Sequence, residues 1–138
     1  MDDAIWLFAS TPQWFIFNSG ELKSDALGAI PMLGVAALVV GIALAVIRRE
    51  KRLIAFLIPF LASQLLLVLA GLSRGRVAQG TADTILYAFL GLQAALAAVL
   101  IWRFRDARLA AAALAVFSLC YALFASFVAT NAMANSWL

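Results

Sequence analysis

Four long stretches without a charged side chain constrain what this chain can fold into. They cover residues 26–47, 53–73, 84–102 and 109–130. Each is close to the roughly 20 residues that an apolar helix needs to cross about 30 Å of hydrocarbon. Strands are excluded as the spanning element, because the stretches are continuously apolar and a membrane barrel needs at least about eight alternating strands. The pattern predicts an all-α membrane protein with four transmembrane helices in a single membrane domain.

The composition excludes an ordinary soluble domain. Of the 138 residues, 66% are hydrophobic and 12% are charged, whereas a soluble domain carries about 25% charged residues. The charged side chains lie outside the apolar stretches, where those next to a stretch would mark a helix end. The chain has one cysteine, which excludes a disulfide scaffold.

The short connections between the stretches predict the topology. Residues 48–52, 74–83 and 103–108 separate consecutive stretches, and short connections make neighbouring helices antiparallel. We therefore expect an up-down-up-down bundle of four helices.

The distribution of basic residues predicts the orientation in the membrane. Seven basic residues lie in the first and third connections, and three, Lys23, Arg74 and Arg76, lie on the opposite side. Because cytoplasmic loops are rich in Lys and Arg, we expect both termini on the periplasmic or extracellular side of a bacterial inner membrane. The seven residues are expected to contact anionic lipid headgroups rather than nucleic acid: Arg48, Arg49, Lys51, Arg52, Arg103, Arg105 and Arg108.

Residues 1–24 form an aromatic segment that is too short and too interrupted to span the bilayer. Its acidic start is unlike the basic start of a signal peptide. Thr11 and Pro12 are typical of a helix N-cap and first helical position, so we expect a helix, a break and a second helix at the outer interface. The segment is either an interfacial anchor or a lid or docking element over the outer mouth of the bundle. Charged residues nearby form either solvated helix ends or a docking patch for it: Glu21, Asp25, Arg74, Arg76 and Asp83.

Small residues recur on one face of three predicted helices, which is typical of membrane helices that pack closely. The repeat is most regular in the last helix, where steps of four and three alternate when Ser118 is counted between Ala115 and Ala122. The faces are Gly34, Ala37, Gly41 and Ala45 in the first helix, Ala88, Gly91, Ala95 and Ala98 in the third, and Ala111, Ala115, Ala122, Ala125 and Ala129 in the fourth.

A layer of polar side chains is predicted near the middle of the membrane. At about 1.5 Å per residue, Ser63, Gln64, Gln93 and Ser118 lie at similar depths. One interpretation is a structural Gln64–Gln93 hydrogen bond between helices, and the other is a polar patch that contacts a ligand, a substrate or a quinone headgroup. Pro59, one turn before Ser63, is expected to kink its helix.

The third helix is expected to contact protein on two faces. At about 100° per residue, Gln93 points nearly opposite the small residues of the same helix. Either two neighbouring helices of the bundle cover both faces, or one of the two faces meets another subunit, and we favour the second.

The chain lacks most side chains that membrane catalysis requires. It has no histidine, its single cysteine is Cys120, and its charged residues lie outside the four stretches. Haem ligation, dithiol exchange and proton-coupled transport are therefore not expected. No catalytic residue, metal site or cofactor is predicted, and contact with a lipid or quinone stays open.

These observations favour a non-catalytic accessory, assembly or structural subunit of a larger membrane complex. Its expected partners are membrane lipids and either other subunits or copies of itself. The alternative is a small self-associating channel or transporter for a neutral or weakly charged solute. A membrane enzyme or quinone-binding protein that uses Tyr87 or Tyr121 is a third interpretation.

Overall fold

The computed structural model describes residues 2–19 and 26–135, and all regular secondary structure in these ranges is helical. Four helical stretches are long and apolar enough to cross a membrane: Ala29–Ile47, Lys51–Leu72, Gln79–Arg103 and Arg105–Ala134. The prediction of an all-α chain with four apolar helices of spanning length is therefore confirmed.

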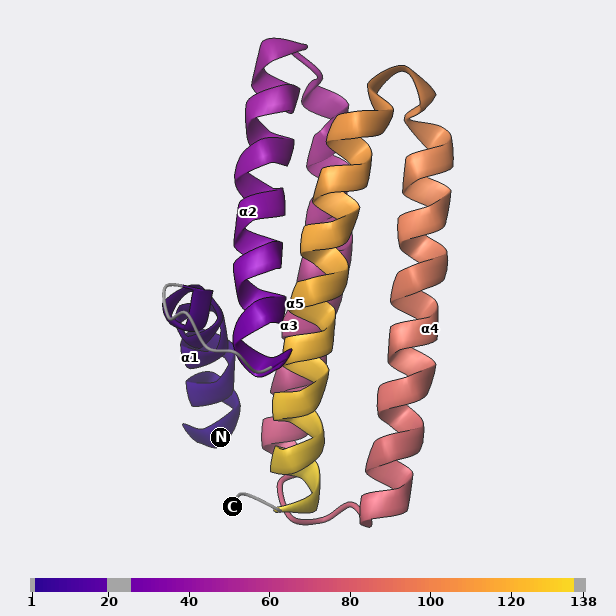
Figure 1. Ribbon diagram of the computed structural model, residues 1–138. Helices are drawn as coiled ribbons and strands as arrows, with labels where there is room; N and C mark the ends of the chain where they lie inside the picture. Colours follow the sequence, from indigo (N-terminus) through magenta and orange to yellow (C-terminus); the bar gives the residue numbers. More distant parts are fainter. Residues whose placement is uncertain (1, 20–25, 136–138) are drawn as a thin grey trace.

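The N-terminal helix α1 (Asp2–Ser19) lies beside an elongated bundle of four helices (Figure 1). The bundle consists of α2 (Ala26–Ile47), α3 (Leu57–Leu72) with the 3-10 helix η1 (Lys51–Phe56) before it, α4 (Gln79–Arg103), and α5 (Arg108–Ala134) with the 3-10 helix η2 (Arg105–Ala107) before it. The helices α4 and α5 extend beyond the predicted stretches 84–102 and 109–130, because helix ends can continue outside an apolar stretch.

The connections gather at two ends of the bundle. Those between α2 and η1 and between α4 and α5 lie at one end, and the connection between α3 and α4 lies at the other, with α1 and the end of α5 (Figure 1). All seven basic residues predicted to contact lipid headgroups belong to the first end, which we call the basic end. There, Arg48 Nη1 donates to the carbonyl oxygen of Asp106 at 2.9 Å and joins the two connections.

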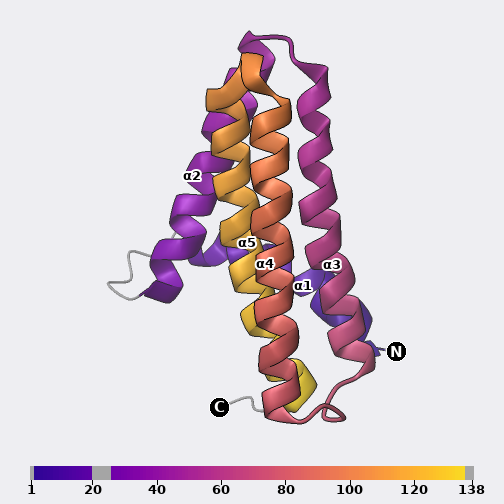
Figure 2. The same ribbon diagram turned by 90° about the vertical axis from the view of Figure 1, so that its right-hand side faces the viewer.

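The central helix of the bundle is α5. Fifteen of its residues are buried, and α2, α3 and α4 each pack on it, with only a slight contact between α3 and α4 (Figure 2). The small residues predicted to form its packing face are all buried: Ala111, Ala115, Ala122, Ala125 and Ala129. Because alanine leaves the backbone accessible, one helix can contact three neighbours closely.

The small-residue face of α2 lies against α5. A β-carbon at Gly34 would lie 2.9 Å from the Cβ of Cys120, and one at Gly41 would lie 2.7 Å from the side chain of Leu114. Ala37 and Ala45, on the same face, are half-buried. The two glycines therefore set how closely α2 approaches α5.

Helix α1 runs without interruption through Pro12, which corrects the predicted break and second helix. Ala4, Leu7, Thr11 and Phe15 are buried and follow one another by three or four positions, so one face of α1 packs on α2 and α3. Burying this face outweighs the backbone hydrogen bond that an internal proline removes, a loss of about 3 kcal/mol. The segment is docked on the bundle.

An exposed ion pair accompanies this docking. Arg74 Nη1 lies 2.7 Å from Asp3 Oδ1, with both side chains at least 42% exposed, so the pair stabilises by at most about 1 kcal/mol. Arg74 therefore belongs to a docking patch for α1, one of the two interpretations of the outer charged residues. Glu21 and Asp25 lie outside the described residues.

The kink expected at Pro59 stays a prediction, but the helix type changes two residues before it, between Phe56 and Leu57. Pro59 is the third residue of α3, directly after the 3-10 segment Lys51–Phe56. Because proline has no N–H, the carbonyl of Ala55 loses its α-helical partner. The tighter i to i+3 bonding of a 3-10 helix is compatible with that loss.

Candidate functional site

All four residues of the predicted polar layer are buried, but they do not form one network. Gln64 Nε2 donates to Tyr121 Oη at 2.7 Å, and Gln93 Nε2 donates to the carbonyl oxygen of Pro59 at 3.1 Å. Neither amide oxygen accepts a hydrogen bond within the described residues. The predicted Gln64–Gln93 hydrogen bond is therefore wrong, because α3 and α4 meet mainly through α5 and the two side chains face different neighbours.

The hydrogen bonds of the layer join helices in pairs. The carbonyl of Pro59 accepts from Gln93 and also from Ser63 Oγ at 3.1 Å, so α4 is joined to the start of α3. Gln64 joins α3 to α5 through Tyr121. Ser118 Oγ instead donates to the carbonyl of Leu114 in its own helix at 2.8 Å. The layer therefore fixes how α3 and α4 are placed around α5.

Replacing Tyr121 with phenylalanine is expected to lower the free energy of unfolding by about 0.5–2 kcal/mol, because the buried Gln64 amide loses its partner. Adding Gln64→Leu to Tyr121→Phe should recover part of this loss, since both polar groups are then removed. Unfolding in SDS of the wild type, both single variants and the double variant measures the coupling. Strictly additive losses would contradict the hydrogen bond.

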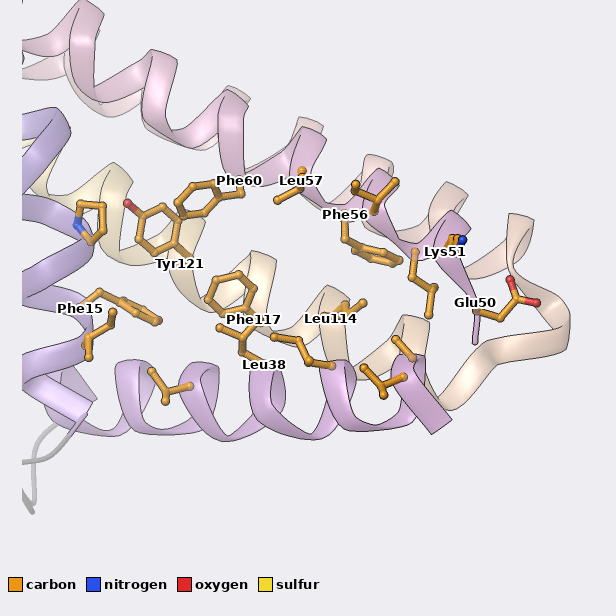
Figure 3. A pocket seen from close by; sticks show the side chains of 18 of the residues that line it. Phe15, Leu38, Glu50, Lys51, Phe56, Leu57, Phe60, Leu114, Phe117 and Tyr121 are labelled. Carbon is orange, nitrogen blue, oxygen red and sulfur yellow. The ribbon is translucent and has the colours of Figure 1, made fainter. Parts of the chain in front are cut away.

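A long apolar groove lies between α2 and α3, with α5 as its floor (Figure 3). Its volume is about 770 Å³, within the range of about 300–1,000 Å³ typical of small-molecule sites. Apolar and aromatic side chains of three helices line it: Val35, Leu38 and Ile42 of α2, Leu57 and Phe60 of α3, and Leu114, Phe117 and Tyr121 of α5. Sequence reasoning missed this groove, because its lining residues are ordinary for membrane helices.

One end of the groove is closed by α1. Pro12, Phe15 and Ile16 line this end, and the Phe15 side chain is buried. The Phe15 ring packs edge-on against three aromatic rings of α5, with centroid distances between 5.2 and 6.2 Å: Phe117, Tyr121 and Phe124. The aromatic residues of the N-terminal segment therefore include one that seals a cavity.

The other end of the groove reaches the basic end of the bundle, where Glu50 and Lys51 line it (Figure 3). Arg49 also belongs to the lining at this end. Arg49 has a left-handed backbone with φ 54°. Its N–H bonds to the carbonyl of Val46, and the N–H of Glu50 bonds to the carbonyl of Ala45, both at 3.1 Å. This is the Schellman ending of a helix, where glycine is the usual residue and another residue costs about 1–2 kcal/mol. The chain nevertheless has an arginine at this position, among the residues that line the groove.

The small-residue face predicted for the third helix is exposed in α4. No other segment of the described chain covers this face. Its four residues are all exposed: Ala88, Gly91, Ala95 and Ala98. A β-carbon at Gly91 would meet nothing within 4 Å. On the opposite face, α4 buries four residues: Ala82, Gln93, Ala97 and Leu100. Within the described chain, α4 therefore uses one of its two candidate packing faces.

Residues 2–19 and 26–135 contain no group of three or more His, Cys, Asp or Glu side chains that could hold a metal ion. Cys120 is buried. The two tyrosines differ in burial. Tyr87 is exposed on α4, whereas Tyr121 is buried and its hydroxyl accepts a hydrogen bond from Gln64.

No family model matches this sequence, and no curated protein or solved structure is significantly similar to it. The groove, the buried polar layer and the exposed face of α4 are therefore the features that bear on function.

Proposed function

We propose that this chain is a non-catalytic accessory, assembly or structural subunit of a larger complex in a bacterial inner membrane. The observation that carries the proposal is the exposed small-residue face of α4. Small residues let the backbone of a second helix approach closely, which is the main way membrane helices associate. Lipid chains do not require such a face, so the expected partner is a transmembrane helix of another protein.

In this proposal the four long helices cross the bilayer in alternating directions, with both termini on the periplasmic side. The short connections and their positions at the two ends of the bundle support this topology (Figure 1). The orientation is supported by the seven basic residues at one end. Large apolar side chains such as Val39, Leu61 and Leu92 are exposed around the bundle, where lipid or a partner would cover them.

The contacts of α4 orient its exposed face. Gln93 is bound to the carbonyl of Pro59, and Ala97 and Leu100 are buried on the same side. Together these contacts fix the rotation of α4 about its axis and direct Ala95 and its small neighbours away from α5. The buried polar layer thus has a structural part in the proposal, as the element that presents the partner face.

The substitution Ala95→Leu is expected to reduce recovery of the partner at least about ten-fold, equivalent to about 1.4 kcal/mol of binding free energy. A leucine there would separate the two helices. The measurement is the amount of the stoichiometric membrane protein that co-purifies with the full chain from native membranes in mild detergent. Ala43→Leu, the same change at an exposed position of α2, is the control and should leave recovery unchanged.

Two results would contradict the proposal: a wild-type chain that purifies without a partner, and equal losses for Ala95→Leu and Ala43→Leu. The alternative, a self-associating channel or transporter, would place the same face against a second copy. Cross-linking of Ala95→Cys in a Cys120→Ala background distinguishes the two, since a cross-linked dimer of this chain favours self-association.

A further inference from the structure

The groove between α2 and α3 is built into the packing of the bundle. Among the described residues, α2 and α3 each pack on α5 and α1 rather than on each other, which leaves about 770 Å³ between them. The lining is apolar along its length, apart from the charged residues at the basic end (Figure 3). The Tyr121 hydroxyl is bound to Gln64. The chemistry of the groove therefore favours a hydrocarbon chain as its occupant.

The length of the groove matches a long chain. Its lining on α2 runs from Val35 to Val46, which is about 17 Å at about 1.5 Å per residue. Half of the hydrocarbon thickness of a bilayer is about 15 Å. The groove is therefore long enough to hold an acyl chain that enters at the basic end and reaches the middle of the bilayer.

The two ends of the groove distinguish a lipid from a protein partner. Pro12, Phe15 and Ile16 of α1 close one end, so a spanning helix of another subunit or of a second copy cannot follow the groove across the bilayer. A groove that binds a lipid can be closed at the apolar end, where the acyl chain stops, but it needs polar groups at the other end for the headgroup. Arg49 and Lys51 provide these groups at the basic end.

Charge at the basic end selects the headgroup. The connection after α2 carries Arg48, Arg49, Lys51 and Arg52 against the single carboxylate of Glu50, and Arg48 is already bound to the carbonyl of Asp106. Arg49 is held in a left-handed backbone that favours glycine. Retaining a cation at this position provides a phosphate contact that glycine cannot make.

We propose that the groove binds one acyl chain of an anionic phospholipid, with the headgroup phosphate at Arg49 and Lys51. The lipid acts as a wedge that holds α2 and α3 apart while both remain on α5. The proposal rests on the membrane location given above but requires no partner for α4, so either can fail without the other.

The test measures lipid bound to the purified full chain by native mass spectrometry, with phosphatidylglycerol and phosphatidylcholine of identical acyl chains as probes. The wild type is expected to retain one phosphatidylglycerol and to prefer it over phosphatidylcholine. Ile42→Trp, which fills the groove from α2, should reduce the bound fraction at least ten-fold. Ile58→Trp is the matched control, since Ile42 and Ile58 are 50% and 55% exposed and Ile58 is not part of the lining.

Leu57→Trp fills the same groove from α3 and keeps the test valid if Ile42→Trp does not fold. Arg49→Gln with Lys51→Gln should abolish the preference for phosphatidylglycerol, whereas Arg103→Gln, at the same end but outside the groove, should retain it. Equal binding of both lipids by the wild type would overturn the proposal. So would undiminished binding by folded Ile42→Trp and Leu57→Trp, or an equal loss in Ile58→Trp.

Discussion

Gly71→Ala is expected to detach α1 from the bundle and to lower the free energy of unfolding by about 3 kcal/mol. A β-carbon at Gly71 would overlap the backbone of α1, where it would lie 2.6 Å from the amide nitrogen of Ala4 and 3.0 Å from its Cβ. Backbone atoms cannot rotate away as a side chain can, so the loss should reach the upper part of the roughly 1–3 kcal/mol typical of overpacking.

Two measurements check this result. Unfolding in SDS gives the loss of stability, and alkylation of Thr11→Cys in a Cys120→Ala background reports the position of α1, because Thr11 is fully buried. Labelling should be slow with Gly71 and fast with Gly71→Ala. Gly80→Ala is the matched control, since a β-carbon there meets nothing within 4 Å. Protected labelling in the Gly71→Ala protein would show that the helices do not cross at this glycine.

Phe15→Ala is expected to cost about 3–5 kcal/mol, the range for removing a fully buried aromatic side chain. The Phe15 side chain is 2% exposed, and its ring lies 5.2 Å from the ring of Tyr121 and 5.5 Å from that of Phe124. Its removal also leaves the groove between α2 and α3 unsealed at the α1 end.

The control for this prediction lies on the same helix. Phe17 is 70% exposed, so Phe17→Ala removes the same atoms without opening a cavity and should change the unfolding free energy by less than about 1 kcal/mol. Both variants can be compared by SDS unfolding and thermal denaturation in one detergent. Similar losses for the two phenylalanines would contradict the assigned docking face of α1.

The four apolar helices were predictable because charge is costly inside hydrocarbon. The residues that interrupt the apolar stretches, such as Arg48, Arg74 and Arg103, can only lie near helix ends, and the described helices place them there. The small-residue repeat that begins at Ala111 also predicts a packed face on α5, although it does not say how many helices share that face.

The course of α1 was not predictable from Pro12. A proline after threonine locally favours a helix start, but Leu7, Thr11 and Phe15 lie on one face that is buried against α2 and α3. Tertiary packing therefore decides the course of the chain at this position. The local signal is outweighed because the contacts that oppose it come from other helices, such as Gly34 of α2 and Gly71 of α3.

The partners of the buried glutamines were not predictable from depth alone. Gln64 and Gln93 are near the same level, but a hydrogen bond also depends on which way each side chain points and on which helices adjoin. Gln64 meets Tyr121, and Gln93 meets the carbonyl of Pro59. Counting along a helix gives height in the membrane, whereas neighbours depend on the arrangement of all helices.

The groove depends on the same arrangement. It exists because α2 and α3 share α5 as a neighbour and, within residues 2–19 and 26–135, do not pack closely on each other. Its apolar lining resembles any lipid-facing surface in composition. Arg49 is unusual among the lining residues, because it occupies a left-handed position after α2 where glycine is usual. This can be recognised only when the backbone conformation is known.

The central position of α5 has a consequence for biosynthesis. The ribosome makes α2, α3 and α4 before α5, yet each of the three packs chiefly on α5. In the membrane location proposed above, the earlier helices would enter the bilayer as separate spans, and their contacts with α5 form only after α5 has been made. Assembly of this bundle is consequently a late, concerted event, and a nascent chain that stalls before residue 108 exposes three helices to quality control.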